Sequence, residues 1–333
     1  MGGDFAPANV VEGALAALDE SKGRLALVLV GQQERIEDEL RKLGHPTSSG
    51  GERFQGLLSV RHAPEVIDMH DPPTAALRTK KESSIAVGLR LHTEGAAQAF
   101  VSAGNTGAVM SASTLILGRM KGVGRPTIGA LVPTAKTPCF LLDAGANVDC
   151  RSRHLFEFAV MGSIFVSSML GKADPAVGLL SIGEEETKGN EVTLETLGML
   201  KQSRLNFIGN VEGGDIFKGE VDVIVCDGFT GNILLKFGES VPAFIKTKFV
   251  AFAAQSFTGK LIGLVARKGL RAVMKELDYQ EHGGVPLLGV NGVSIIGHGR
   301  STPKAIKNMI YRAEEMVSRK VNTHILEALQ KYS

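Results

Sequence analysis

The sequence predicts an α/β protein with a mostly parallel sheet and helices on both faces. Short continuous apolar runs recur along the chain, and such runs suit strands that are buried on both faces. Segments with helical periodicity lie between them, and this alternation is typical of βαβ units. The 333 residues also include 40 glycines, which gather in loops after apolar runs, where tight turns are needed.

The first apolar run reads LALVLV and stops at Gly31. We expect strands at 25–30, 99–102, 128–132, 140–142, 177–181, 221–226 and 293–296. Helical patterns occur at 8–20, 154–170 and 190–202. The length allows one large domain or two smaller ones. We interpret residues 1–333 as a single catalytic domain that contains a basic amphipathic helical hairpin at 240–278.

Composition and missing motifs exclude several classes of protein. The net charge of +2 gives no overall field that favours nucleic acid. The three cysteines lack CxxC spacing, which indicates reduced thiols in a cytoplasmic protein. No signal peptide or membrane-spanning apolar run is visible. There is no P-loop, GxGxxG, GxSxG or HExxH pattern, so we expect no nucleotide, serine-hydrolase or metal site.

Polar, glycine-containing loops follow six of the apolar runs. They occupy 102–107, 143–149, 181–191, 209–215, 226–232 and 297–301. Ligands in open α/β sheets bind beyond the carboxyl ends of strands. Glycine allows close backbone approach, and exposed N–H groups attract anions. The loops therefore predict an anion-binding cleft, with His298 as a candidate between two glycines.

The loop motifs, in their order along the chain, resemble the bacterial acyl-acyl carrier protein:phosphate acyltransferase (PlsX) family. They are MGGDFAP, SAGNTGA, LLDAGANVDC, IGEEETKGNE, NFIGNVEGGDI, VDVIVCDGFTGN, GGVPLLGVNG and IGHGRS. The resemblance implies a fold related to phosphotransacetylase and the isocitrate/isopropylmalate dehydrogenases. It also implies a homodimer that needs no cofactor. Such an enzyme moves a fatty acyl group from acyl carrier protein to inorganic phosphate, and a membrane glycerol-3-phosphate acyltransferase uses the acyl phosphate.

The reaction asks for positioning and for oxyanion stabilisation, because phosphate is already a nucleophile. We expect Lys188 to stabilise the charge, although it could instead be a solvated lysine that balances Glu184 to Glu186. Asn232 is expected to donate beside it, and could also cap a helix that starts at Ile233. Asp143 is expected to orient its loop. The predicted phosphate- and substrate-binding residues are Gly104, Asn105, Thr106, Asp143, Asn147, Glu185, Gly231, His298, Gly299 and Ser301.

Three other functions remain open at this point. A phosphotransacetylase that uses acetyl-CoA would share the fold, so the fold does not separate the two. A metal-dependent decarboxylating dehydrogenase would need clustered acids and several arginines, and no such cluster is visible. A non-catalytic membrane-associated scaffold for lipid synthesis would not depend on Lys188.

The segment 240–275 contains no Asp or Glu but seven Lys or Arg residues. Two helical patterns flank an expected turn at 256–264 with exposed apolar residues. Packing on the core or across a dimer interface explains part of the apolar face, but not the uniform positive charge. We therefore expect peripheral binding to an anionic membrane. The predicted contacts are Phe257, Lys260, Leu261, Leu264, Arg267 and Lys268.

The chain opens with Met1-Gly2-Gly3-Asp4, a loop-to-helix pattern with no strand before it. The resemblance implies a strand directly before the Met-Gly-Gly-Asp sequence. The sequence therefore predicts that an added upstream strand would raise thermal stability, because it would cover a sheet edge.

Overall fold

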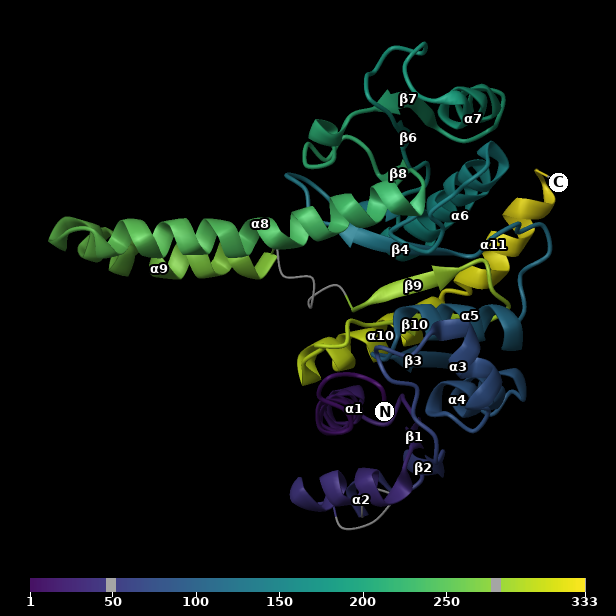
Figure 1. The fold of residues 1–333 in the computed structure, drawn as a ribbon, viewed down its shortest axis with the longest axis vertical. Helices are drawn as coiled ribbons and strands as arrows, with labels where there is room; N and C mark the ends of the chain where they lie inside the picture. The colour runs from purple at the N-terminus through teal and green to yellow at the C-terminus, as the bar shows by residue number, and fades with distance from the viewer. Residues whose placement is uncertain (46–51, 277–282, 333) are drawn as a thin grey trace.

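The computed structural model describes residues 1–45, 52–276 and 283–332 (Figure 1). The strands are β1 (Leu27–Gly31), β2 (Leu58–His62), β3 (Ala99–Ser102), β4 (Thr127–Val132), β5 (Cys139–Leu142), β6 (Val177–Leu180), β7 (Phe207–Val211), β8 (Val223–Val225), β9 (Val285–Leu288) and β10 (Val293–Ile296). The α-helices are α1 (Ala8–Ser21), α2 (Gln33–Lys42), α3 (Pro73–Thr79), α4 (Ser84–Thr93), α5 (Thr106–Ile116), α6 (Ser152–Leu170), α7 (Glu191–Lys201), α8 (Gly228–Ala254), α9 (Phe257–Glu276), α10 (Pro303–Ser318) and α11 (Val321–Gln330). Short 3₁₀ turns lie at Glu52–Phe54 and Gly213–Asp215.

The strands form a mixed sheet of eight in the order β3-β10-β9-β4-β5-β8-β6-β7, and β1 pairs with β2 separately. Five of the eight strand pairs are parallel, and the antiparallel ones are β10–β9, β9–β4 and β4–β5. The prediction of a mostly parallel α/β sheet is confirmed. Because three reversals separate β10 from β5, the strands β3 and β10 run opposite to β5, β8, β6 and β7. The loops that follow these strands therefore form two groups.

The predicted strands all form, with small shifts at their ends. Three further strands, β2, β7 and β9, were not predicted. β7 reads FIGNV, with only two apolar residues before Gly209. β2 reads LSVRH and is largely exposed, so it lacks the continuous apolar run of a buried strand. β9 contains Pro286, and proline inside a run argues against a central strand. Pro286 is tolerated here at a short strand between antiparallel neighbours.

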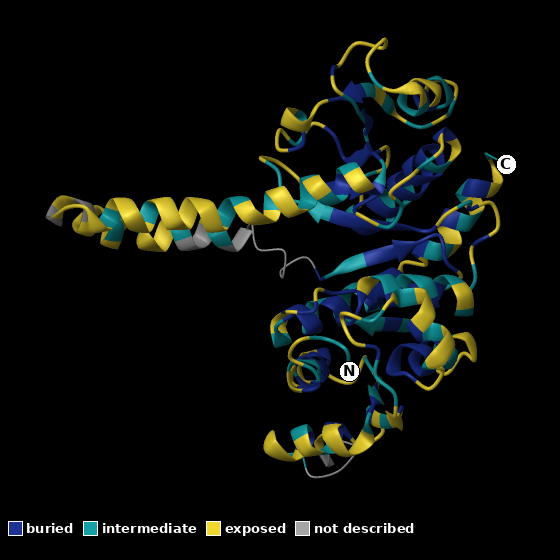
Figure 2. Cartoon of the chain, in the orientation of Figure 1, coloured by how far each residue is buried: buried dark blue, intermediate teal, exposed yellow. Residues whose placement is uncertain are grey.

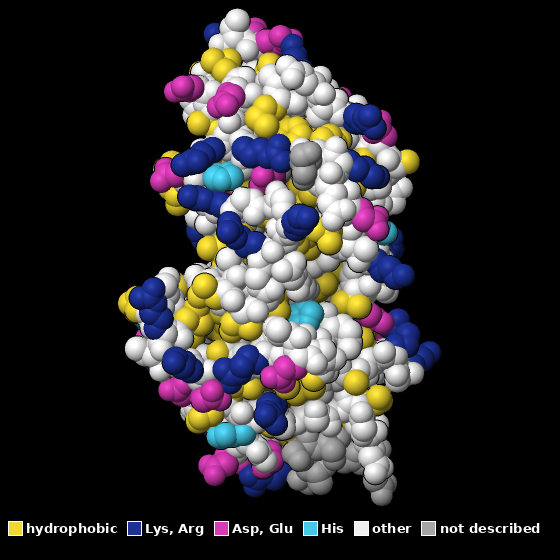
Figure 3. Space-filling view, turned by 90° about the vertical axis from the view of Figure 1, so that its right-hand side faces the viewer, with side chains coloured by type: hydrophobic (Ala, Val, Ile, Leu, Met, Phe, Trp, Pro, Cys, Tyr) yellow, Lys and Arg dark blue, Asp and Glu magenta, His cyan; other side chains and the backbone are white. Residues whose placement is uncertain are grey.

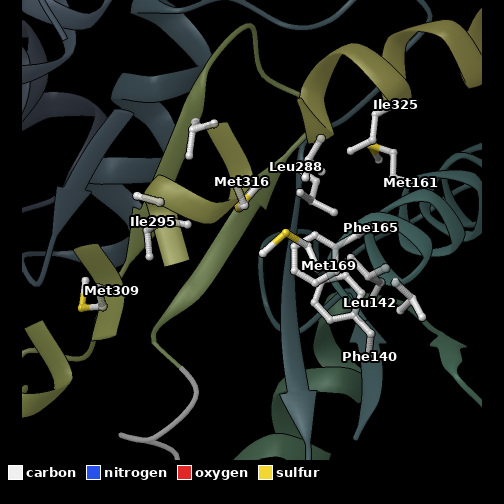
Figure 4. Packing of buried hydrophobic residues seen from close by; sticks show 14 of the residues in the cluster. Phe140, Leu142, Met161, Phe165, Met169, Leu288, Ile295, Met309, Met316 and Ile325 are labelled. Carbon is white, nitrogen blue, oxygen red and sulfur yellow. The ribbon is translucent and has the colours of Figure 1, made fainter. Parts of the chain in front are cut away.

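The main hydrophobic core lies between the central strands and α6. Phe140 from β5 stacks on Phe165 from α6 with ring centroids 4.1 Å apart (Figure 4). Both rings are fully buried, and Leu142 and Met161 join the same cluster. Gly129 on β4 makes room for the Phe140 ring, because a Cβ there would lie 2.1 Å from its Cζ. This rigid centre fixes where β5, and the polar loop after it, leave the sheet.

Helices α8 and α9 form a hairpin that projects from the body (Figure 1), and its residues are mostly exposed (Figure 2). The expected boundaries were wrong in two places. The first helix begins at Gly228 rather than 240, and the connection is at Gln255 and Ser256 rather than 256–264. Gly263 suggested a turn, but it lies inside α9 against Ala253, where a Cβ would be 2.8 Å from the Ala253 Cβ. The Phe257 side chain and residues 277–278 lie outside the described residues.

Candidate functional site

The first group of loops follows β3 and β10 and meets the N-terminal segment. The Asp4 N–H donates to the Gly299 carbonyl over 2.8 Å. Gly3 lies so close to the Ala103 carbonyl that an added Cβ would be 2.8 Å from it. The residues 1–6, 102–106 and 297–301 therefore form one tightly packed surface.

Asn105 holds a neighbouring loop in place in this group. Its Nδ2 donates to the carbonyls of Asp68, Met69 and Asp71 over 3.1–3.2 Å. Its Oδ1 accepts the Ala108 N–H over 3.0 Å and caps α5. The side chain is 7% exposed, so both of its polar atoms are committed to holding the loop 68–71 on α5.

Gly104 lies just before α5. Thr106 is the first residue of this helix and is exposed. The turn after β10 is held by its own hydrogen bonds. Ser301 is buried, and its hydroxyl donates to the His298 carbonyl over 2.6 Å. Ser301 therefore stabilises the turn. The His298 ring is exposed, and its Nδ1 accepts the Arg300 N–H over 3.2 Å. A neutral His298 accordingly carries its proton on Nε2.

The second group is organised by Asp143, which is fully buried at the end of β5. Its carboxylate accepts N–H groups from Gly145, Ala146 and Asn147 over 2.7–3.0 Å, and the Asn147 Nδ2 over 2.8 Å. Burial raises the pKa of Asp143, and these donors act against that rise. Asp143 thus holds the 143–147 loop in its shape. Its carboxylate accepts hydrogen bonds from this loop and is not placed to bind an anion.

The Asn147 side chain also makes its hydrogen bonds within this region. Its second Nδ2 hydrogen bond goes to the Pro126 carbonyl over 2.8 Å. Its backbone carbonyl accepts the Gly228 N–H over 2.7 Å. The Asp143 loop is therefore tied to the first residue of α8.

Asn232 lies in the second turn of α8, where this helix contacts the Asp143 loop. The N-cap of α8 is Asp227, which accepts the Thr230 N–H over 2.9 Å, so the alternative of Asn232 as a helix cap is wrong. A Cβ on Gly145 would lie 3.2 Å from the Asn232 Cβ. Among the described residues, the Asn232 side chain makes no hydrogen bond. Its half-buried amide is a donor that is positioned but not used.

Gly231 permits this contact. A Cβ at Gly231 would lie 1.9 Å from the Asp143 carbonyl oxygen. Its role is close backbone approach between α8 and the loop.

Lys188 and Glu185 lie in the exposed loop after β6. Asn210 on β7 holds this loop, because its Nδ2 donates to the Glu185 carbonyl over 3.0 Å. Strand β8 lies between β5 and β6 in the sheet, so the loop neighbours the second group. In the part of the chain that the structure describes, no hydrogen bond or ion pair joins Lys188 to Asn232 or to the Asp143 loop. The sequence analysis did not predict a role for Asn210, because an asparagine beside a glycine is also common in ordinary turns.

Two thiols flank the Asp143 loop, and neither is poised as a nucleophile. Burial raises the pKa of Cys150 to about 11, and raises that of the fully buried Cys226 well above its usual range. The Cys226 Sγ donates to the Asp143 carbonyl over 3.8 Å. The reactive form of cysteine is the thiolate, so these residues are packing groups near neutral pH.

An open groove of about 430 Å³ runs beside α5 and ends at the Asp143 loop. Its lining residues are Thr74, Met110, Ser111, Thr114, Leu115, Arg119, Gly124, Arg125, Pro126 and Asn147. Sequence reasoning missed the two arginines, because they belong to a connection with no site-like motif.

Within the described ranges, no cluster of three His, Cys, Asp or Glu side chains could hold a metal ion. In the same ranges, no helix is both long and apolar enough to cross a bilayer.

A family model described as "Fatty acid synthesis protein" matches residues 1–324. The chain is 50% identical over 332 residues to a phosphate acyltransferase from Heliobacterium modesticaldum, covering 100% of this chain and 95% of the relative. It is 46% identical to a phosphate acyltransferase from Pelotomaculum thermopropionicum, with 99% and 93% covered. The chain belongs to this phosphate acyltransferase family. It is accordingly an acyltransferase enzyme of fatty acid and phospholipid synthesis.

Solved structures show the same fold at low sequence identity. A phosphotransacetylase from Streptococcus pyogenes superposes with a TM-score of 0.58 at 17% identity, over 93% of this chain and 91% of the other. A branched-chain phosphotransacylase from Enterococcus faecalis has a TM-score of 0.60 at 15% identity, over 95% and 96%. The prediction of a phosphotransacetylase-related fold is confirmed.

Proposed function

We propose that this enzyme transfers a long-chain fatty acyl group from acyl carrier protein to inorganic phosphate. A phosphate oxygen attacks the thioester carbonyl carbon, and the C–S bond of the tetrahedral intermediate breaks. The carrier thiolate leaves and takes up the proton of the attacking hydrogen phosphate. The products are an acyl phosphate and the free carrier thiol, and no cofactor takes part.

The observation that carries this proposal is the Asn232 amide on α8, which lies against the Asp143 loop and makes no hydrogen bond among the described residues. A preorganised amide donor suits the oxyanion of the tetrahedral intermediate, and one such donor is worth about 3–4 kcal/mol. The two nearby thiols have raised pKa values, which supports direct attack by phosphate over an acyl-cysteine intermediate. Lys188 would bring the positive charge if its loop closes over the substrate.

The test is to incubate the enzyme with palmitoyl-acyl carrier protein and phosphate and to detect palmitoyl phosphate by mass spectrometry. Acetyl-CoA is the second donor in the same assay. Acetyl phosphate without palmitoyl phosphate would establish the phosphotransacetylase alternative. If a Lys188→Ala protein without activity still supported bacterial growth, a scaffold role would replace the catalytic one.

We also propose that the α8–α9 hairpin binds reversibly to anionic membranes, which would deliver a poorly soluble product to a membrane glycerol-3-phosphate acyltransferase. Leu261 and Leu264 are 57% and 68% exposed, and Lys260, Arg267 and Lys268 are exposed beside them. Each cation near anionic headgroups contributes about 1 kcal/mol. The enzyme would then be a cytoplasmic protein that associates peripherally with the bilayer.

Sedimentation with phosphatidylglycerol vesicles tests this binding. The double variant Leu261→Glu with Leu264→Glu should stay in the supernatant, while Leu194→Glu, at an exposed position on α7, should sediment like the original protein. Binding should weaken as salt is added. If the original protein fails to sediment at low salt, the hairpin has no membrane role.

A homodimer is the third part of the proposal. Phe229, Ile233 and Phe237 recur every four residues along α8 and are 59%, 52% and 66% exposed. An apolar stripe of this kind favours burial against a second copy. Light scattering should give a dimer for the original protein and a monomer for Phe237→Glu. A monomeric original protein would contradict this assignment.

A further inference from the structure

The groove beside α5 leads from the molecular surface to Asn147 in the second group of candidate residues. At one end Asn147 binds the Asp143 carboxylate, whose loop contacts Asn232. On the α3 side Thr74 follows Pro73, and Pro73 packs against Gly107 in the first turn of α5. At the other end the groove opens between Leu115 and the arginines of the 117–126 connection. A flexible chain lying in this groove could therefore reach the candidate site from the surface.

The outer end of the groove carries arginines that pair with no carboxylate among the described residues. The Arg119 guanidinium donates to the Gly124 carbonyl over 2.5 Å, and that of Arg125 to the Asp149 carbonyl over 3.0 Å. Both acceptors are neutral, so these bonds hold the side chains in place and leave their charges free. Among the described residues, neither arginine forms an ion pair, and the same holds for the exposed Lys121 and Arg151.

The acids in this region do not cancel these charges. Glu157 is buried and occupied, because it pairs with Arg153 over 3.0 Å and accepts the Gly124 N–H over 2.7 Å. The Asp149 side chain is exposed and forms no ion pair among the described residues. His154 lies between these elements, and burial lowers its pKa, as do the charges of Arg125 and Arg151. Arg125 and Arg151 therefore lie near enough to the same histidine to act on it together.

Apolar side chains stand beside the cations. Leu115 is 70% exposed on α5, and Val148 is 62% exposed on the Asp143 loop. The space-filling view onto this side of the molecule shows a group of Lys and Arg side chains just above a waist, and further ones below it (Figure 3). A rim of unpaired cations around exposed apolar groups is the surface that an acidic protein with an apolar centre would complement.

We propose that this rim, formed by Arg119, Lys121, Arg125 and Arg151, docks a small acidic acyl carrier protein, and that the carrier's thioester arm lies in the groove along α5. The groove volume of about 430 Å³ lies within the range of about 300–1,000 Å³ that suits a small-molecule arm. This inference rests on the proposed function, because it takes the carrier-bound thioester as the acyl donor. The phosphate of the arm would meet Arg119 or Arg125 at the groove entrance.

Two donors with the same thioester separate docking from chemistry: decanoyl-acyl carrier protein and decanoyl-pantetheine, which lacks both protein and phosphate. In the double variant Arg119→Glu with Arg125→Glu, the KM for the carrier should rise about tenfold or more, because rim charges steer an oppositely charged partner. The KM for decanoyl-pantetheine should rise much less than the KM for the carrier, because this donor brings no acidic protein to the rim. Added salt should raise the carrier KM of the original enzyme much more than that of the variant.

A second variant guards against misfolding of the first. Lys121→Glu with Arg151→Glu changes two exposed side chains and should raise the carrier KM in the same direction. The matched control is Arg61→Glu with Arg204→Glu, which reverses two exposed charges on β2 and after α7 and should leave the carrier KM unchanged. Thermal unfolding verifies that each variant is folded.

The outcomes separate the docking surface from the reaction itself. If both rim variants keep the original carrier KM, the docking surface is wrong while the proposed function stands. If the control raises the KM as much as the rim variants, net charge explains the effect and the surface assignment falls. If the original enzyme acylates phosphate from neither donor, the proposed function fails, and this inference fails with it.

Discussion

Gly231→Ala is the substitution that best tests the fit between α8 and the Asp143 loop. The new Cβ would lie 1.9 Å from the Asp143 carbonyl oxygen and 3.0 Å from the Cys226 Sγ. Non-bonded atoms prefer separations of about 3.5 Å or more, so the first turns of α8 must move by more than an ångström. Both neighbours are buried, and neither is the free end of a flexible side chain.

The expected loss of activity is much larger than the expected loss of stability. Overpacking costs about 1–3 kcal/mol, and replacing glycine by alanine in a helix returns about 1 kcal/mol. The melting temperature should therefore fall by only a few degrees. A displacement of about 1 Å at a catalytic group can reduce the rate about a hundredfold, so turnover should fall to about 1% because Asn232 moves with its helix.

Gly238→Ala is the matched control, because it lies in the same helix and its Cβ would have no neighbour within 4 Å. It should keep full turnover and gain up to about 1 kcal/mol of stability from helix propensity. The assay is release of acyl phosphate from palmitoyl-acyl carrier protein, with thermal unfolding measured in parallel. If Gly231→Ala matches Gly238→Ala in turnover, the contact between α8 and the loop does not position the reaction.

Three further predictions follow from the same structure. Lys188→Ala and Asn232→Ala should stay folded and lose about a hundredfold or more in kcat, the cost of one oxyanion donor; near-normal turnover at saturating phosphate would remove either residue from the mechanism. Cys150→Ala should keep most of its activity, and at pH 8 the Cys150 thiol, with its pKa raised to about 11, should react with iodoacetamide far more slowly than free cysteine; loss of activity together with a trapped acyl-enzyme would point to covalent catalysis. Asn105→Ala should lower the free energy of unfolding by about 2–4 kcal/mol in denaturant titration, since it leaves buried partners unsatisfied; an unchanged midpoint would show that these hydrogen bonds contribute nothing.

The buried strands were predictable because each is buried on both faces. A strand such as β5 must then be apolar throughout, and its four consecutive residues, Cys139 to Leu142, are all apolar. The same local reasoning failed for β2, which is mostly exposed, and for β9, which contains Pro286. It also failed for the start of α8, because Gly228 and Gly231 look like loop residues.

The site itself was only partly predictable. The sequence places Asp143, Asn147, Gly231 and Asn232 in loops of the right kind, and the structure brings them together. The sequence does not show which of these side-chain donors already make hydrogen bonds within the protein and which remain available to a ligand. Asn105 and Asn232 each stand near a glycine. The first donates its side-chain N–H groups to carbonyls about 35 residues away, and the second donates to no group in the part of the chain that the structure describes.

The amino-acid sequence by itself determined the α/β class and the family, because burial on both faces demands apolar runs and because eight ordered motifs are specific where each alone is weak. Tertiary structure alone decided which polar groups remain available. The hydrogen bonds of Asn105, and the packing of Gly231 on the Asp143 carbonyl, join segments that are distant in the chain. The groove between Arg125 and Asn147 exists for the same reason, since it forms only when α5 and the Asp143 loop are brought side by side.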